Sequence, residues 1–305
     1  MYACIDLGGT NIRGTWIDIF GNHGSIQIFS RPRTLEGTKD SLLGLLTNIR
    51  AKAPAQLRGI GLASAGPLDH LEKKYLQTSN MRELNYFTVG EFLENAFDLP
   101  VLMENDAQAA ALGEVWNGCL AGVGEAVVLT LGTGIGSGVI QKDVIWRGGH
   151  FTGPELGHIF LGPACKRACG CGQVGCAETW LNKEALIELF QHEGIQVLEL
   201  KDVFPLLREG DVRALRVISE YGHRLGLYLS IIQVVFGFDY IGLSGGMSHF
   251  IPYCLDQVWQ TLTHRFVNRK WWLPKRIANS PDPEMSALYG MARAWILAEE
   301  AYYTE

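Results

Sequence analysis

Short apolar runs that end in glycine-containing turns alternate with amphipathic segments in the first half of the chain. The run 3–5 leads into the turn 6–11, and the run 59–63 leads into the turn 65–69. Leucine and isoleucine recur at helical spacing over 40–51, which predicts a helix there. We expect further helices over 91–97 and 106–116, and extended segments over 13–19 and 100–103. Because strands alternate with helices, the pattern predicts an α/β fold with ligand groups at the strand ends.

The second half of the chain starts with the same arrangement. The apolar strand 126–131 leads into the turn 132–138, and the chain is extended again at 139–140. A third glycine turn, 243–247, follows the strand 240–242, and a helix is predicted over 286–300. Since a strand–turn–strand unit occurs once in each half, the sequence suggests a duplicated fold whose two lobes face a central cleft.

Composition excludes several classes of protein. The 305 residues correspond to about two domains, and the formal net charge of −6 does not favour nucleic acid as a partner. The N-terminus lacks the basic and apolar regions of a signal peptide. Polar residues and a glycine interrupt the apolar stretch 225–243, which predicts a buried helix that runs into a strand rather than a membrane span. We expect a cytoplasmic protein with no membrane partner, in which seven cysteines do not form a disulfide framework.

The 36 glycines gather where apolar runs end, and turns of this kind expose backbone N–H groups that can bind phosphate oxygens. Thr10 and Thr133 add hydroxyl groups at two of the turns. Asp6 could lie near phosphates only with a cation between them, which implies Mg²⁺. For any single turn, the alternative to phosphate binding is a tight hairpin that binds no ligand. The sequence contains neither a P-loop motif nor a dinucleotide-binding fingerprint. The candidate nucleotide-binding residues are Asp6, Gly8, Gly9, Thr10, Asn11, Gly132, Thr133, Gly134, Gly245 and Gly246.

A carboxylate stands at the junction between the predicted strand 100–103 and the helix 106–116. Asp106 would lie at the N-terminus of this helix, which favours its ionised form. An ionised aspartate can accept the proton of a hydroxyl group that attacks a phosphoryl group. Spacing alone favours a simpler role for Asp106, that of a helix cap.

Histidine and cysteine cluster between residues 155 and 178. His158, Cys169, Cys171 and Cys176 can supply one imidazole and three thiolates, the ligands of a closed tetrahedral Zn²⁺ site. Cys165 lies in the same segment and could replace one of them. A disulfide or inert buried thiols are the alternatives. The segment therefore predicts a small zinc-bound loop.

Together these motifs resemble the ROK family of bacterial sugar kinases and repressors, within the sugar kinase/Hsp70/actin superfamily. The turns 6–11, 131–138 and 243–247 are similar to its two phosphate motifs and its adenosine motif, and the segment 157–178 is similar to the ROK signature. The resemblance extends over nearly the whole chain. It implies two ribonuclease-H-like lobes of the actin-like ATPase fold, 1–107 plus 286–305 and 108–285, with ATP, Mg²⁺ and a structural Zn²⁺ as ligands.

The resemblance also implies roles for individual residues. Asp106 falls on the catalytic base of the family, and Asn105 on a residue that binds a sugar hydroxyl. His158 would bind zinc through one ring nitrogen and face the sugar with the other. The implied sugar contacts are Ser64, Ala65, Gly66, Ser79, Asn80, Asn105, Asp106, Glu155, His158 and Glu178.

We therefore expect an ATP-dependent hexose kinase that converts glucose to glucose 6-phosphate and, by family tendency, a homodimer or homotetramer. Kinases of N-acetylmannosamine, fructose or allose are the alternatives, and a sugar-responsive repressor or a non-catalytic sugar sensor is an alternative of another class. Because the first predicted strand begins at residue 3, we do not expect the helix-turn-helix domain that precedes the first glycine motif in the repressors. Two departures from the family pattern concern specificity. Ala65 stands where many members have proline, and Leu181-Asn182-Lys183 stands where many have a Ser-Gly pair.

Overall fold

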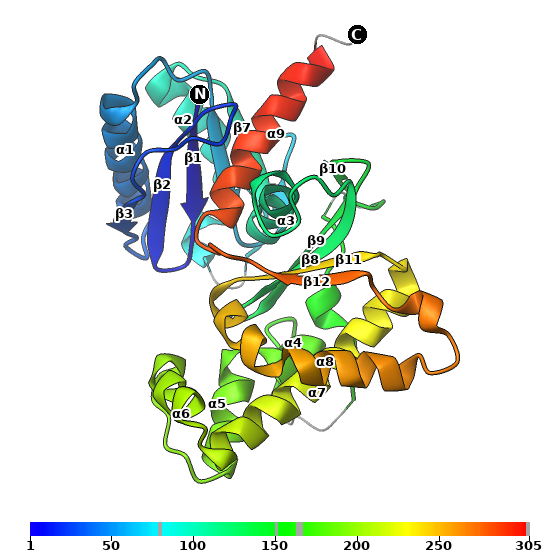
Figure 1. Cartoon of the computed structure of the whole chain (residues 1–305). Helices are drawn as coiled ribbons and strands as arrows, with labels where there is room; N and C mark the ends of the chain where they lie inside the picture. Colours follow the sequence, from blue (N-terminus) through cyan, green and yellow to red (C-terminus); the bar gives the residue numbers. More distant parts are fainter. Residues whose placement is uncertain (79–80, 150–151, 163–166, 303–305) are drawn as a thin grey trace. The chain divides into compact units, whose positions relative to one another are not determined.

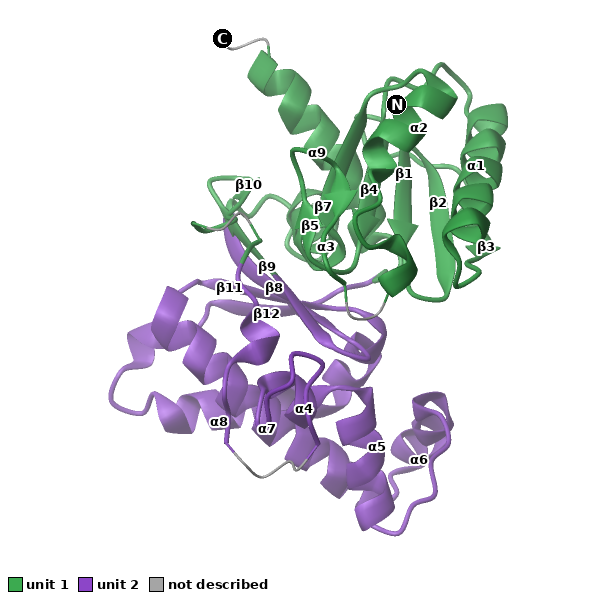
Figure 2. Cartoon of the chain, turned by 180° about the vertical axis from the view of Figure 1, so that it is seen from behind, with its two compact units in different colours: residues 1–124, 138–153, 282–305 green, residues 125–137, 154–281 purple. Residues whose placement is uncertain are grey.

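The computed structural model describes residues 1–78, 81–149, 152–162 and 167–302 (Figure 1). These residues form two compact units (Figure 2). The first unit takes residues 1–124, 138–153 and 282–305, and the second takes 125–137 and 154–281. The final helix therefore belongs to the N-terminal unit, and the second unit is inserted into the first.

A mixed five-stranded sheet forms the centre of the first unit. Its strand order is β3 (Gln27–Ser30), β2 (Asn11–Ile17), β1 (Tyr2–Leu7), β4 (Ile60–Ser64) and β7 (Val101–Asn105). The pairs β1–β2 and β2–β3 are antiparallel, whereas β1–β4 and β4–β7 are parallel. A small hairpin, β5 (Leu68–Asp69) and β6 (Lys74–Tyr75), and the short helix η1 (Arg82–Leu84) follow β4.

Side chains alternate across this sheet and bury both of its faces. Ala3, Ile5 and Leu7 belong to a core that includes buried side chains of α1 (Leu35–Lys52) and α2 (Val89–Phe97). Tyr2 and Cys4 belong to a second core, formed with α3 and α9. These two helices span Asp106–Asn117 and Ser286–Tyr302. The unit thus has three layers, with helices on both faces of the sheet.

Two glycines bring α3 and α9 into close contact. A Cβ atom added at Gly113 would overlap the carbonyl oxygen of Ser286, and one added at Gly290 would overlap the carbonyl oxygen of Ala109. The helices also share a buried hydrogen bond, at 2.5 Å, from the Ser286 hydroxyl to the Glu114 carboxylate. The crossing therefore depends on the lack of side chains at two positions, and it fixes α9 to the helix that follows β7.

The second sheet has the same order of strands as the first. It runs β10 (Val144–Ile145), β9 (Ile135–Gln141), β8 (Glu125–Leu131), β11 (Tyr240–Ser244) and β12 (Arg276–Asn279). The pair β9–β10 is antiparallel, and β8–β11 and β11–β12 are parallel. Two sheets with equivalent order and direction agree with the duplication inferred from the glycine turns.

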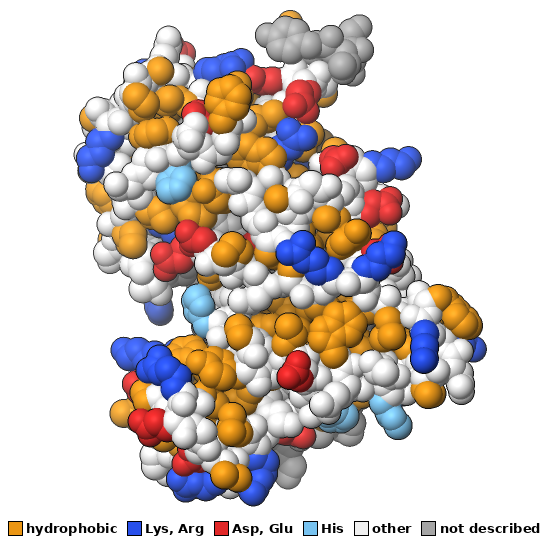
Figure 3. All heavy atoms as spheres, in the orientation of Figure 1, with side chains coloured by type: hydrophobic (Ala, Val, Ile, Leu, Met, Phe, Trp, Pro, Cys, Tyr) orange, Lys and Arg blue, Asp and Glu red, His pale blue; other side chains and the backbone are white. Residues whose placement is uncertain are grey.

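Helices make up most of the second unit. Its long helices, α7 (Val212–Phe236) and α8 (Ile251–Arg265), pack against each other, and α4 (Ala177–Leu181) and α5 (Lys183–His192) pack on α7. The other helices are α6 (Phe204–Glu209), η2 (Leu156–His158), η3 (Leu200–Val203), η4 (Gly246–Phe250) and η5 (Lys270–Trp272). On the face drawn in Figure 3, basic and acidic side chains are interspersed.

The predicted α/β class with two lobes is confirmed by these elements. The apolar stretch 225–243 is the C-terminal part of α7 followed by β11, as predicted, and Gly237 ends the helix at φ 65°. Within the described ranges, none of the helices combines the length and apolar character needed to cross a membrane. The predicted lobe boundaries, 1–107 plus 286–305 and 108–285, stay a prediction.

Candidate active site and metal centre

The carboxyl ends of three neighbouring strands in the first unit lie side by side. Leu7 of β1 pairs with Ser64 of β4, and Ser64 pairs in turn with Asn105 of β7. The first glycine turn and Asp106 directly follow these positions. In parallel sheets the carboxyl edge is where ligands bind. The register therefore gathers predicted phosphate, sugar and catalytic residues at one edge of one sheet.

The first glycine turn is a tight connection between β1 and β2. The Gly8 N–H donates to the carbonyl oxygen of Asn11 at 3.0 Å, and a side chain at Gly9 would meet open space. Asp6, on β1, pairs with the Arg13 guanidinium at 3.1 Å. Burial raises the pKa of Asp6, and the charge of Arg13 opposes that rise. In the structure Arg13 is therefore the positive charge beside Asp6, the carboxylate for which the sequence predicted a neighbouring Mg²⁺.

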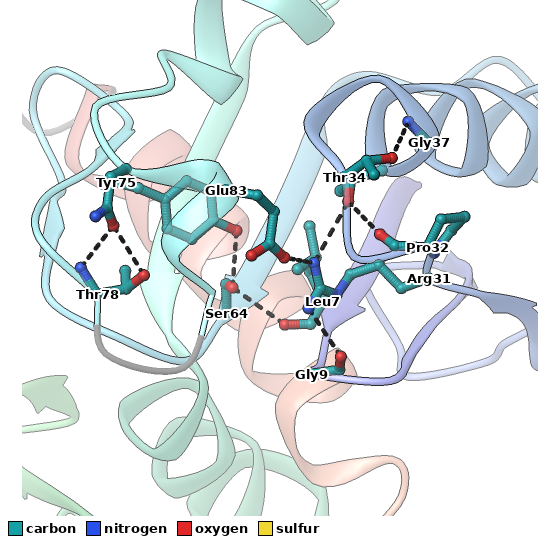
Figure 4. A network of polar contacts seen from close by, with 12 residues as sticks. Leu7, Gly9, Arg31, Pro32, Thr34, Gly37, Ser64, Tyr75, Thr78 and Glu83 are labelled. Atoms are coloured by element: carbon teal, nitrogen blue, oxygen red, sulfur yellow. Dashed lines mark hydrogen bonds and ion pairs between the residues drawn. The ribbon is translucent and has the colours of Figure 1, made fainter. Parts of the chain in front are cut away.

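A buried arginine is hydrogen-bonded to the first glycine turn (Figure 4). The Arg31 side chain is 1% exposed and donates to the Gly9 carbonyl oxygen at 2.8 Å and to the Glu83 carboxylate at 2.5 Å. The Arg31 backbone N–H donates to the Thr10 carbonyl oxygen at 2.8 Å. Arg31 therefore ties two consecutive carbonyls of the turn to the segment around η1.

Ser64 is fully buried at the end of β4. Its hydroxyl donates to the Leu7 carbonyl oxygen at 3.1 Å and accepts a hydrogen bond from the Tyr75 hydroxyl at 2.8 Å (Figure 4). Gly66 follows at φ 107°, a conformation that favours glycine. Ala65 lies between them, and Ser79 and Asn80 lie outside the described residues. The sugar contacts at these positions stay predictions.

Asn105, rather than Asp106, caps helix α3. Its side-chain oxygen accepts from the N–H groups of Ala107 at 3.0 Å and Gln108 at 3.2 Å. Asp106 is the first helical residue, and its Oδ1 also accepts from the Ala107 N–H, at 2.8 Å. The half-buried carboxylate therefore stands at the positive end of the helix, where the ionised form is favoured.

A polar cluster centred on a buried glutamate supports the residues before Asp106. The Glu104 carboxylate, 3% exposed, pairs with the Arg147 guanidinium and with the His70 imidazole, the latter at 3.3 Å. The same carboxylate accepts the backbone N–H of Asn105 at 2.9 Å. Because Arg147 follows β10 and His70 follows β5, the cluster fixes three segments of the first unit around the end of β7.

The second and third glycine turns are neighbours in the second unit. Strands β8 and β11 pair in parallel up to Thr130 and Ser244, so their following turns leave the same edge of the sheet. Gly245 adopts φ 82°, and a Cβ atom there would come 2.5 Å from the Leu131 carbonyl oxygen. Only glycine can both adopt this positive φ without strain and avoid a clash with the Leu131 carbonyl oxygen. This close approach brings the predicted phosphate turn 132–134 beside the predicted adenosine turn.

The four predicted metal ligands lie together in the second unit. One donor atom from each of His158, Cys169, Cys171 and Cys176 lies within 4.8 Å of every other. The Cys171 and Cys176 sulfurs are 3.6 Å apart, and the Cys169 sulfur is 3.4 Å from Nδ1 of His158. Zinc–sulfur bonds of about 2.3 Å in a tetrahedron place sulfurs about 3.8 Å apart. The donor set and its spacing therefore fit Zn²⁺.

The protonation of these thiols responds to burial and to hydrogen bonds. Burial raises the pKa of Cys169 to about 12, whereas the Gln173 backbone N–H lowers the pKa of the exposed Cys171. Zinc binds thiolates, so loading the site would release protons. Cys165, which could replace a ligand, lies outside the described residues.

The two predicted sugar-binding glutamates of the second unit differ in their surroundings. Glu178, in the first turn of α4, accepts the Ile135 N–H at 3.0 Å and the Cys169 thiol at 3.3 Å. Glu155 precedes η2, where its carbonyl oxygen accepts the His158 N–H at 3.1 Å. Glu178 thus joins the second glycine turn to the metal cluster. The ring nitrogen of His158 that faces the Cys169 sulfur is Nδ1.

The sequence model of the ROK family matches residues 2–299. The chain belongs to the ROK family. It is 27% identical over 293 residues to a glucokinase from Halalkalibacterium halodurans, covering 84% of this chain and 87% of the relative. It is 28% identical over 262 residues to an N-acetyl-D-glucosamine kinase from Escherichia fergusonii, covering 82% and 85%. It is 29% identical over 301 residues to a xylose repressor from Bacillus spizizenii, covering 93% and 75%.

Two solved ROK structures share the fold. The ROK hexokinase from Thermus thermophilus has a TM-score of 0.81 and 27% identity, covering 98% of this chain and 99% of that one. The ROK family glucokinase from Streptomyces griseus, solved in complex with glucose and AMPPNP, has a TM-score of 0.82 and 25% identity, covering 96% and 98%. The predicted family and fold are confirmed.

Several residues of this ROK protein that surround the candidate site are not predicted by motif. Glu104 carries a signal, because a charged residue stands in an otherwise apolar strand just before Asn105. Arg31 carries none, since the segment around it reads as a polar surface loop. Arg147 and His70 are equally ordinary in the sequence, and only the folded chain brings them to Glu104.

Proposed function

We propose that the protein is an ATP-dependent sugar kinase that phosphorylates a hexose at a primary hydroxyl, with glucose as the first candidate. The observation that carries the proposal is the position of Asp106. Its carboxylate stands at the N-terminus of α3, at the same sheet edge as the first glycine turn. The glucokinase from Halalkalibacterium halodurans and the Streptomyces griseus complex with glucose and AMPPNP support this choice of substrates.

In the proposed mechanism Asp106 accepts the proton of the sugar hydroxyl as the hydroxyl oxygen attacks the γ-phosphorus of ATP. The bond from this phosphorus to the β,γ-bridging oxygen breaks, and ADP leaves. The Asn105 cap and the bond from its N–H to Glu104 hold Asp106 at the helix end. The amide group of Asn105 donates to a sugar hydroxyl. A rigid base suits phosphoryl transfer, since positioning and charge stabilisation supply most of the rate.

The nucleotide is assigned to the three glycine turns. Backbone N–H groups and the hydroxyls of Thr10 and Thr133 donate to phosphate oxygens. Asp6, which pairs with Arg13 at 3.1 Å, would hold Mg²⁺ together with the nucleotide phosphates, since Mg²⁺ is commonly held by one carboxylate and substrate phosphates. When bound, Mg²⁺ neutralises phosphate charge.

The remaining assignments concern the sugar and the His/Cys cluster. Zinc, when bound to the cluster, is structural and braces the loop that carries it. We assign sugar contacts to Glu155, His158 and Glu178 in the second unit, and separately to Ser64, Gly66 and Asn80 in the first.

ADP release measured with glucose, mannose, N-acetylmannosamine, N-acetylglucosamine, fructose and allose tests the proposal. We expect turnover with at least one sugar, and glucose is expected to be the best. Preference for N-acetylglucosamine would instead place the chain with the Escherichia fergusonii relative. Sugar binding without turnover would favour the sensor or repressor alternative, which the Bacillus spizizenii relative represents.

Asp106→Asn tests the catalytic base directly. It should lower kcat by roughly 100-fold or more while sugar and nucleotide binding stay near wild type. Asp40→Asn, at an exposed position on α1, is the matched control for loss of one carboxylate. If Asp106→Asn keeps more than about a tenth of the wild-type kcat, the assignment of the base is wrong.

A further inference from the structure

Asn182, at one of the positions where the chain departs from the family pattern, connects two parts of the second unit. It is the N-cap of α5, and its side-chain oxygen accepts the Ala185 N–H at 3.0 Å. Its amide group donates to the Thr133 carbonyl oxygen at 3.2 Å. With 7% of its surface exposed, Asn182 is a buried polar residue that bonds both a helix end and a glycine turn.

The start of α5 holds the second glycine turn at two consecutive carbonyls. The Lys183 N–H donates to the Gly132 carbonyl oxygen at 2.8 Å, next to the bond from Asn182 to Thr133. In a trans peptide the C=O and the following N–H point in opposite directions. Holding these carbonyls toward α5 therefore turns the N–H groups of Thr133 and Gly134 away from it, the orientation in which successive N–H groups can meet an anion.

Asn182 also bonds to the segment that carries the metal cluster. The Arg167 guanidinium, two residues before Cys169, donates to the Asn182 side-chain oxygen at 3.3 Å and to the Thr179 carbonyl oxygen at 2.9 Å. It also pairs with Glu188 on α5 at 2.9 Å. A continuous set of contacts therefore runs from the cluster segment through Arg167 and Asn182 to the turn.

We propose that Asn182 is a positioning residue for the second glycine turn, and that through Arg167 it couples nucleotide binding at that turn to the metal-binding loop. The inference rests on the proposed function, because it takes the turn to bind nucleotide phosphates. A serine at position 182 could still cap α5 but lacks the amide group that holds Thr133. Asn182 thus makes the hydrogen bond to the Thr133 carbonyl in addition to capping α5.

Asn182→Ser separates positioning from capping, since serine is a good N-cap. The measurement is the calorimetric dissociation constant of AMPPNP with Mg²⁺, which requires no turnover. Loss of one hydrogen bond predicts a dissociation constant roughly three- to tenfold above wild type. The KM for ATP should rise by a similar factor, while the sugar dissociation constant measured without nucleotide stays within about twofold.

Asp211→Ser is the matched control, because Asp211 caps α7 in the same unit through the N–H groups of Arg213 and Ala214. It should leave AMPPNP binding unchanged. Asn182→Asp serves if the serine variant does not fold, since aspartate keeps the cap and the bond from Arg167 but cannot donate to Thr133. Equal AMPPNP affinity in wild type and the Asn182 variant that folds would overturn the proposal, as would an equal loss in Asp211→Ser.

The coupling to the loop has its own test. Arg167→Met should weaken AMPPNP binding in the same direction as Asn182→Ser, with the metal content of both variants measured by elemental analysis. Removing the metal from wild type should weaken AMPPNP binding, and removing it from Asn182→Ser should add no further loss. An equal further loss would refute the coupling through Asn182. If wild type binds no AMPPNP at all, the proposed function fails instead.

Discussion

Replacing Arg31 by methionine tests whether a buried ion pair stabilises the first unit. Methionine keeps the unbranched apolar part of the side chain but removes the guanidinium. The variant loses the bonds to the Gly9 carbonyl at 2.8 Å and to Glu83 at 2.5 Å, and a longer one to Thr38 at 3.4 Å. Of these groups, only Glu83 would keep a charge without its partner.

The size of the effect follows from these contacts. A hydrogen bond to a charged group contributes about 1.5–3 kcal/mol, and breaking a buried ion pair costs about 3–5 kcal/mol. The Glu83 side chain is 21% exposed, so water can hydrate its carboxylate when Arg31 is gone. That exposure places the cost for Arg31→Met near the lower end, at about 3 kcal/mol. This is a large part of the roughly 5–15 kcal/mol that stabilises a typical protein.

Urea unfolding followed by tryptophan fluorescence measures the free energy of unfolding for Arg31→Met, Glu83→Gln and the double variant. We expect losses of about 3 and about 1.5 kcal/mol for the single changes, and a double-variant loss at least about 1 kcal/mol below their sum. Lys74→Met is the control, since its pair with Asp69 is partly exposed at 4.0 Å and should contribute less than about 1 kcal/mol. Additive losses would refute the ion pair, and an Arg31→Met loss under about 0.5 kcal/mol would refute the whole estimate.

The same pair predicts a pH dependence. Burial would raise the pKa of Glu83, but the hydrogen bond and charge of Arg31 outweigh burial and lower it. A lowered pKa in the folded state stabilises the protein above the unfolded-state value of about 4.3, and this contribution is lost as pH falls through the folded-state pKa. The stability difference between wild type and Arg31→Met should therefore narrow below about pH 4. A constant difference down to pH 2 would contradict this origin.

Three further changes test other parts of the molecule. Elemental analysis should find about one zinc per chain, and chelation should lower both sugar affinity and Tm; zinc-free protein with full activity and affinity would exclude this role. Gly290→Ala should lower the free energy of unfolding by about 1–3 kcal/mol or more, because its Cβ would overlap the Ala109 carbonyl oxygen. Gly149→Ala, whose Cβ would meet open space, should leave the thermal unfolding unchanged. Tyr75→Phe should cost about 1 kcal/mol by removing the bond to Ser64, and an unchanged Tm would contradict that bond's contribution.

The strand ends of the candidate site are predictable from sequence because each combines an apolar run with a glycine or polar turn. The runs at 3–5, 59–63 and 126–131 all correspond to observed strands, with ends shifted by a few residues. The His/Cys ligands are predictable for a similar reason, since their chemistry and spacing are both local. Residue type and spacing therefore predict which side chains lie together at the strand ends and in the metal cluster.

Long-range polar contacts are not predictable in this way. Arg31 follows β3 and reads as an exposed basic residue, yet it is buried by contacts to residues 22 and 52 positions away. Spacing favours Asp106 as the helix cap, but Asn105 takes that position. The helices α4 and α6 have five and six residues, fewer than two turns, so apolar periodicity cannot mark them.

The position of α9 has a consequence for how the chain is made. Residues 286–302 cover Tyr2, Cys4 and Ile17 on one face of the first sheet, but their synthesis begins roughly 160 residues after residue 124, where the first stretch of that unit ends. At about 5–20 residues per second, this interval lasts roughly ten to thirty seconds. Nearly all of the inserted second unit is synthesised during that time, up to residue 281, while the face of the first sheet under α9 still lacks this helix. The unit that is synthesised first therefore stays incomplete until α9 emerges, and apolar surface left open in this way during synthesis is prone to aggregation.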